Sequence, residues 1–386
     1  FKMLGSFSQA WELDPTHADA GAKLAETFVL FGNEEEGREV AEEVLSLDPE
    51  QSIALSALAL IELRAENPES AANYAQRSLA ADASNPQAIG VALSLYRDED
   101  PEQAMAIIDA GLALDPTNPR IRSLKIGLLD ALDRPDEVLE EIDLLIEYDP
   151  DEIKNYYILS SYYVKIERLV DAEAIHRQVI EKLNGKAWQA KVEEGEVQRI
   201  PEGTAEVELA RFLAANHGIP RGIAELESQL AEKPEVFPIR EALVDYYTIR
   251  NTISGEDPEK SRQLLLEVFE YDTEGQDAQQ ARTSLANLEL RQRRDVEAAE
   301  RWIDEAIELE PENPRALTLR AEIALAKGNY KQSIADSRLV LRVNPDAWGS
   351  LLLLAQAQEK DGSPSLALDN YRKVLALKPN STKALY

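Results

Sequence analysis

Apolar and small residues recur along this chain with the spacing of paired amphipathic helices. Each period carries large, large, small and large residues at positions 4, 7, 8 and 11, then small and apolar residues near positions 20, 24, 27 and 28. Residues three and four apart share one helix face, so each half of the period predicts a helix with one apolar side. The segment Ser350–Pro379 shows the pattern most clearly, with Leu351, Leu354, Ala355, Ala367, Tyr371, Val374 and Leu375 at these positions and Gly362 between the two helices.

A proline closes most of these periods at a regular spacing. The prolines are Pro15, Pro49, Pro116, Pro150, Pro311, Pro345 and Pro379, and four of the gaps between them are 34 residues. Proline is tolerated just beyond a helix end, where it interrupts no helical hydrogen bond. A helix–turn–helix period of 34 residues is the tetratricopeptide (TPR) signature, and the chain resembles that superfamily over essentially its whole length. The resemblance implies an all-α fold, a right-handed TPR solenoid.

The repeat pattern predicts a half repeat, ten full repeats and one interruption. The interruption, at residues 185–202, has two glycines, one proline and no helical period, so the chain is predicted to divide into parts 1–184, 185–202 and 203–386. Two repeats exceed 34 residues, with their extra residues expected around Asn251–Asp257 and Thr273–Asp277, which are rich in turn formers. The full repeats are 16–49, 50–83, 84–116, 117–150, 151–184, 203–234, 235–272, 273–311, 312–345 and 346–379.

The interruption admits two interpretations. One is a surface loop or a short extra helix between regular repeats. The other is a docking element anchored by Trp188, because tryptophan is common among the residues that dominate binding at protein interfaces.

The charge balance narrows the class of partner. The chain has 41 Lys and Arg against 72 Asp and Glu, a formal net charge of −31. Nucleic acid and anionic membrane surfaces both require a basic binding face, so neither is expected as a general partner. The excess of carboxylates is expected on the convex, solvated face, where it keeps a long array soluble; a basic partner and a high-salt habitat are the alternatives.

Cysteine and hydropathy usage exclude further classes. There is no cysteine, so disulfides, thiolate zinc sites and cysteine nucleophiles are absent. No apolar run is long enough for a transmembrane helix, and we expect no signal peptide among these residues. Residues 1–13 and 382–386 match incomplete repeats without polar caps. We therefore expect a window from a longer chain, with self-association through the uncapped ends as one consequence.

The sequence offers little catalytic chemistry. The histidines His17, His176 and His217 fall in three different repeats, which predicts no metal site, and His176 occupies a core position. Phosphate loops, nucleophile elbows and zinc-protease helices are all missing from the sequence. We expect neither an enzyme nor a cofactor.

Binding is a better-supported prediction than catalysis, although an array of ten helix pairs also places some Lys and Arg inward by chance. In a TPR superhelix, positions 2, 5, 9, 12 and 13 of the first helix of each repeat line the concave surface. We assign to that surface Arg64, Tyr96, Arg97, Arg120, Lys154, Tyr157 and Lys165, with Arg211, Arg291 and Arg315 as a weaker set in the second half. Cations and aromatics within an acidic protein favour an acidic peptide or a glycan as the ligand.

A narrower resemblance bears on function. The segments AEVELARFLAANHGIPRGIAELESQL (205–230) and IADSRLVLRVNPDAWGSLLLLAQAQEKDGSPSLALDNYRKVLALKP (334–379) look like the large bacterial TPR-repeat lipoproteins of polysaccharide-export and PEP-CTERM protein-sorting systems. Those proteins are exported, longer and lipid-anchored at an amino-terminal cysteine, which this sequence does not contain. The resemblance implies a protein–protein interaction scaffold in the bacterial envelope, periplasmic or outer-membrane-associated.

Three alternatives to an envelope scaffold stay open. The segment could serve as a regulatory or targeting module of a larger enzyme such as a glycosyltransferase. It could be a self-assembling structural solenoid, and its compartment could be the cytoplasm.

Overall fold

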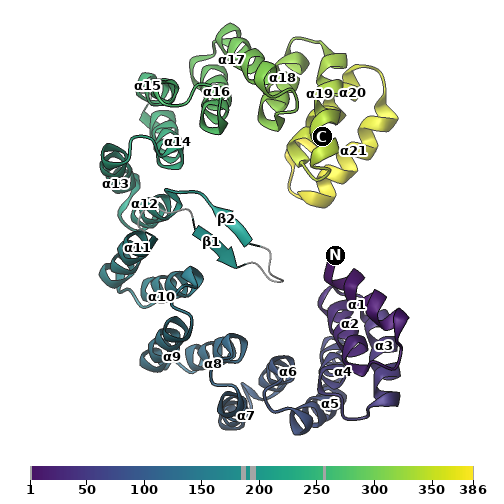
Figure 1. Ribbon diagram of the computed structural model, residues 1–386. Coiled ribbons are helices and arrows are strands. Elements are labelled where there is room, and N and C mark those ends of the chain that lie inside the picture. The colour runs from purple at the N-terminus through teal and green to yellow at the C-terminus, as the bar shows by residue number, and fades with distance from the viewer. Residues whose placement is uncertain (1, 184–187, 192–196, 255–257, 386) are drawn as a thin grey trace. The chain divides into compact units, whose positions relative to one another are not determined.

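Antiparallel helix pairs make up nearly all of the chain that the computed structural model describes, residues 2–183, 188–191, 197–254 and 258–385 (Figure 1). The chain divides into two compact units, Phe1–Ile175 and His176–Tyr386. The division falls inside one helix, whereas the sequence predicts it at residues 185–202; the predicted three-part organisation stays a prediction.

The first unit holds one single helix followed by helix pairs. In chain order these are α1 (Lys2–Leu13), α2 (Ala18–Leu30), α3 (Glu34–Leu47), α4 (Ser52–Arg64), α5 (Pro68–Ala81), α6 (Pro86–Tyr96), α7 (Pro101–Leu114), α8 (Pro119–Ala131), α9 (Pro135–Tyr148) and α10 (Ile153–Lys165). Helix α11 (Leu169–Leu183) contains the boundary between the units.

The second unit opens with two strands and continues with helix pairs. Its elements are β1 (Trp188–Lys191), β2 (Val197–Ile200), α12 (Thr204–His217), α13 (Ile219–Glu232), α14 (Phe237–Ser254), α15 (Glu259–Leu266), η2 (Glu267–Glu270), α16 (Gln276–Leu288), η3 (Glu289–Arg293), α17 (Val296–Leu309), α18 (Pro314–Ala326), α19 (Tyr330–Val343), α20 (Trp348–Lys360), α21 (Pro364–Leu377) and α22 (Thr382–Leu385). Each predicted repeat contains one helix pair, so the all-α TPR solenoid fold is confirmed.

Small residues allow the helices of a pair to approach closely, as the pattern predicts. Ala25 in α2 and Ala41 in α3 are fully buried in one apolar cluster with Leu24 and Val44. At Gly37 in α3, an added Cβ would lie 2.6 Å from Val29 Cγ2. A larger side chain there would force the pair apart, because protein interiors have few voids that could absorb it.

Several of the turns within pairs contain a residue with a left-handed backbone conformation. Gly32 fills this place between α2 and α3 with φ +83°. Glu66, Asp133 and Glu167 adopt the same conformation at the equivalent turns, with φ between +55° and +61°. Residues other than glycine rarely adopt this left-handed backbone conformation, so the fold tolerates some local strain at those turns.

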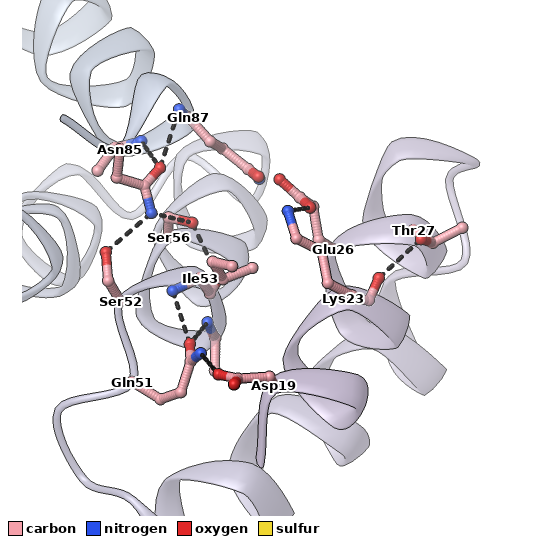
Figure 2. A network of polar contacts seen from close by, with 12 residues as sticks. Asp19, Lys23, Glu26, Thr27, Gln51, Ser52, Ile53, Ser56, Asn85 and Gln87 are labelled. Carbon is pink, nitrogen blue, oxygen red and sulfur yellow. Dashed lines mark hydrogen bonds and ion pairs between the residues drawn. The ribbon is translucent and has the colours of Figure 1, made fainter. Parts of the chain in front are cut away.

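A polar network joins the beginnings of consecutive first helices (Figure 2). Asn85 Oδ1 accepts hydrogen bonds from the backbone N–H groups of Gln87 and Ala88 at 3.0 and 3.1 Å, which caps α6. The Asn85 side-chain NH₂ donates to Ser52 Oγ at 2.9 Å and to Ser56 Oγ, both on α4. One side chain therefore both starts a helix and links it to the preceding repeat.

The predicted interruption contains an antiparallel β-hairpin rather than a loop or an extra helix. Trp188 pairs with Ile200, and Lys191 pairs with Val197. Two paired four-residue strands hydrogen-bond along their facing edges, and this pairing does not need the apolar periodicity of a packed helix. The side chains of this hairpin, Trp188 among them, lie outside the described residues.

The long repeats absorb their extra residues mainly by extending helices. Helix α14 continues through Asn251 to Ser254, where the sequence predicts turn structure. In the next repeat, the π-helical turn η3 (Glu289–Arg293) lengthens the first helix, whereas residues 273–275 form the predicted irregular segment. A π-turn accommodates an insertion inside a helix without ending it.

Candidate partner-binding grooves

The structure brings three of the predicted groove residues into one hollow. Lys154, Tyr157 and Lys165 of α10 line a groove of about 400 Å³ in the first unit, with Ile126 from α8 and Ile142 from α9 opposite them. Ile158, Ser161 and Tyr162 complete the lining. Helical spacing places these side chains of α10 on one face, so the predicted cluster forms over about three turns of a single helix.

The two lysines of this first groove differ in their partners. Lys165 pairs with Asp130 of α8, and this hydrogen bond raises the pKa of the Lys165 ammonium. Its Nζ also lies 5.9 Å from the centre of the Tyr162 ring. No carboxylate among the described residues pairs with the exposed Lys154 ammonium. The first groove therefore presents an available cation beside tyrosine rings.

The other predicted groove residues do not join this cluster. Arg64 donates to the Val29 carbonyl at 2.8 Å and lies 3.3 Å from Glu34, so it ties α4 to the preceding pair. Tyr96 is half-buried against the core and accepts a hydrogen bond from Gln76 at 3.4 Å.

The remaining two residues of the predicted set lie at helix ends. Arg97 pairs with its neighbour Asp98 at 2.8 Å, which raises the pKa of the Arg97 guanidinium. Arg120 is exposed at the beginning of α8. Neither residue lines the first groove, and their proposed contact with a partner stays a prediction.

A larger groove, which sequence reasoning missed, lies in the second unit. It measures about 970 Å³ and is bordered by α14, α16, α18 and the beginning of α20. Its floor is apolar, with Val244, Leu288 and Leu319 buried. Its polar lining consists of Glu241, Asp245, Thr248, Thr283, Ser284, Asn287, Gln292, Arg315, Thr318, Asn344, Asp346 and Ser350, beside Trp348.

Hydrogen bonds between elements hold the walls of this second groove. Gln292 Nε2 in η3 donates to Thr248 Oγ1 in α14 at 2.7 Å. Thr318 Oγ1 in α18 lies 3.4 Å from Ser350 Oγ in α20. These contacts link successive first helices and so connect the walls of the groove.

One ion pair spans the second groove. Arg315 Nη1 of α18 lies 3.0 Å from Glu241 Oε1 of α14, two repeats earlier in the chain. One turn further along α14, burial and the Glu241 carboxylate raise the pKa of Asp245, while Arg315 and Arg211 act in the opposite direction. The Asp245 side chain is nevertheless accessible from the groove.

The arginines that the sequence places in the second half all have carboxylate partners. Arg211 pairs with Glu208 at 2.7 Å, Arg291 bonds Glu322 at 2.6 Å, and Arg315 is held by Glu241. The second half therefore offers no free cationic groove made of these residues. Glu241 and Asp245 hold repeat positions 5 and 9 in α14. A search of these positions for carboxylates as well as for cations would have found them.

A metal site and a membrane-spanning helix each place requirements on the described residues. Across residues 2–183, 188–191, 197–254 and 258–385, no group of His, Asp and Glu side chains could hold a metal ion. The His176 ring lies 4.9 Å from the Phe212 ring and is buried, which fits the core position predicted for it. The helices of the described segments are all too short or too polar to span a bilayer.

Comparisons with known proteins agree with the repeat architecture. One tetratricopeptide-repeat model matches residues 12–86, 253–314, 295–339 and 318–382, and a second matches residues 95–161. A TPR repeat-containing protein of Rhizobium etli is 27% identical over 124 residues, which is 32% of this chain. The matched region spans 60% of that relative's length.

Solved structures give matches of low identity. Yeast Tom70 is 12% identical with a TM-score of 0.48, over 99% of this chain and 89% of that chain. The Cut9–Hcn1 assembly of APC/C is 13% identical with a TM-score of 0.42, over 99% of this chain and 80% of that chain.

Proposed function

The chain belongs to the tetratricopeptide-repeat family, whose models match more than half of its residues, and from this premise we propose that it is a non-catalytic protein-interaction scaffold. Partner proteins would bind in the grooves lined by the first helices of the repeats. The observation that carries the proposal is the convergence of Lys154, Tyr157 and Lys165 in one groove. Tyrosine supplies a large contact area with few rotatable bonds, and an exposed ammonium attracts acidic partners.

We propose further that this scaffold is part of a protein assembly in a bacterial cell envelope. The assembly would handle exopolysaccharide or sorted surface proteins. The resemblance of residues 205–230 and 334–379 to lipoproteins of those systems supports this assignment. It would place the protein in the periplasm or at the outer membrane. The ligand of the first groove would be an acidic peptide segment or a glycan that carries carboxylates.

Affinity capture from the organism that carries this chain tests the scaffold function. Wild-type chain, Lys154→Glu and Lys373→Glu would serve as baits, with recovered proteins quantified by mass spectrometry. Lys373 is an exposed cation of α21, outside both grooves, so its reversal changes the net charge by the same amount. Lys154→Glu is expected to reduce partner recovery about three- to tenfold, because it replaces an attraction with a repulsion.

Equal recovery on all three baits would contradict a role for the first groove. Recovery of envelope or polysaccharide-export proteins would support the proposed compartment. Recovery of the chain alone would instead favour self-association, for which Leu366 and Leu377, both exposed on one face of α21, offer apolar contacts.

A further inference from the structure

The two grooves of this chain have opposite charge. The lining of the first groove includes two lysines and no carboxylate. The lining of the second includes Glu241, Asp245 and Asp346 against a single cation, Arg315. Because Arg315 is engaged by Glu241 at 3.0 Å, the second groove retains an excess of two carboxylates.

Those two carboxylates are accessible and unpaired. Asp245 lies on α14 and Asp346 precedes α20, so they border the groove from different repeats. Both side chains are exposed, and no ion pair joins either of them to a lysine or arginine within the described chain. The same groove has an apolar floor made by the buried Val244, Leu288 and Leu319.

We propose that the second groove binds an extended segment of a partner protein that carries lysine or arginine. The long aliphatic stem of such a side chain can pack on the apolar floor while its charged end reaches a carboxylate. The groove extends across first helices of successive repeats, a length that suits an extended chain. Asn287 and Gln292 supply amides that can bond to the backbone of that chain.

Trp348 contributes contact area rather than the primary charge recognition. Its side chain is 43% exposed at the groove, but Lys378 Nζ of the same chain already lies 4.0 Å from the ring centre. Lys378 would repel a second cation at the face of the Trp348 ring. The carboxylates Asp245 and Asp346 therefore carry the proposed specificity.

This inference rests on the proposed scaffold function and adds a second partner chemistry to it. A scaffold with one cationic and one anionic groove would bind two different segments. The first groove would select acidic sequences, and the second would select basic ones.

Selection from a randomised peptide library on the immobilised chain provides the test. Enriched peptides would be labelled, and their affinities measured by fluorescence anisotropy for three proteins: wild type, Asp245→Asn with Asp346→Asn, and Glu297→Gln with Glu308→Gln. Glu297 and Glu308 are exposed on α17, outside the groove. The two double variants lose the same charge, so the second controls for general attraction to an acidic protein.

We expect one class of enriched peptides to be rich in lysine or arginine. The groove variant should bind this class about fivefold or more weakly than wild type, whereas the α17 variant should stay within about twofold. Thermal unfolding of both variants would establish that each is folded. The inference would be overturned if the selection enriched no basic peptides, or if both variants bound the basic peptides equally more weakly than wild type.

Failure of the inference is distinguishable from failure of the scaffold function. Acidic peptides that lose affinity in Lys154→Glu would keep the scaffold function standing even if no basic class appeared. A selection that yields no binding peptide of either class would overturn both.

Discussion

At the scale of single residues, the side chain at position 4 of the first helix can form a hydrogen bond as well as pack in the core. Arg122, Tyr156 and Arg240 each hold this position and donate to the backbone carbonyl of the proline six residues earlier, at 2.6, 3.2 and 2.7 Å. Each of these side chains satisfies a carbonyl in the turn between repeats. Two of the three are arginines, so the apolar pattern alone would not identify the role.

The buried charge of Arg122 gives a stability prediction. Arg122 is 4% exposed and pairs with Glu141, whose carboxylate also lies 2.9 Å from Lys125 Nζ. Replacing Glu141 with Gln leaves Arg122 buried without its counter-charge, and we expect a loss of about 3 kcal/mol in the free energy of unfolding. Glu140→Gln, on an exposed neighbour, is the matched control. Equal urea midpoints for the two variants would contradict this account.

Tyr371 gives a prediction for alkaline pH. Burial and the hydrogen bond to Glu359 Oε2, 2.9 Å long, raise the pKa of Tyr371 to about 12. Because the folded pKa lies above the ordinary value of about 10, the neutral phenol stabilises the fold below pH 10. That contribution is lost as pH rises from about 10 to 12. The difference in unfolding free energy between wild type and Tyr371→Phe should therefore shrink over this range, and a constant difference would contradict the assignment.

At the scale of helices, most boundaries could be predicted from the sequence. All ten predicted repeats contain one helix pair, because a buried small residue, a turn residue and a closing proline recur together in most of them. The departures occur where the helical period fades. The hairpin β1–β2, the extension of α14 and the π-turn η3 depend on backbone hydrogen bonding rather than on apolar spacing, so the pattern carried no signal for them.

The caps of these helices give a prediction at the same scale. Asn85 caps α6 and bonds to Ser52 and Ser56, whereas Asn33, at the beginning of α3, makes no capping hydrogen bond through its side chain. Asn85→Ala should lower the free energy of unfolding by about 2 kcal/mol, since it removes a cap and leaves buried hydroxyls with fewer partners. Asn33→Ala should cost less than about 0.5 kcal/mol. Denaturant unfolding would compare them, and a larger effect at Asn33 would be incompatible with this role for Asn85.

At the scale of the whole chain, excess negative charge should set the response to salt. A formal net charge of −31 implies repulsion that opposes folding. Raising NaCl from about 10 to 150 mM shortens the screening length from roughly 30 to 8 Å, and we expect the melting temperature to rise by about 2–5 °C. Salt also weakens the surface ion pairs. A fall in melting temperature would show that those pairs outweigh the repulsion.

The candidate sites were only partly predictable at this scale. Helical spacing on α10 was enough to group Lys154, Tyr157 and Lys165. The second groove requires contacts between helices of different repeats, such as Arg315 with Glu241, 74 residues apart. Whether a charged side chain is free or paired depends on such contacts. The sequence therefore predicted that arginines of the second half line a groove. It did not predict that carboxylates pair with them.

The Arg315–Glu241 contact has a mechanical consequence. In an ideal solenoid each repeat contacts only its neighbours, so the array deforms under tension like identical springs in series. A contact between α14 and α18 skips the intervening repeat and acts as a spring in parallel with that part of the series. Under a small stretching force, α14 to α18 should therefore extend less per repeat than an array without such a bridge. The part of the second groove between α14 and α18 lies within this stiffer stretch and would keep its width while other repeats are strained.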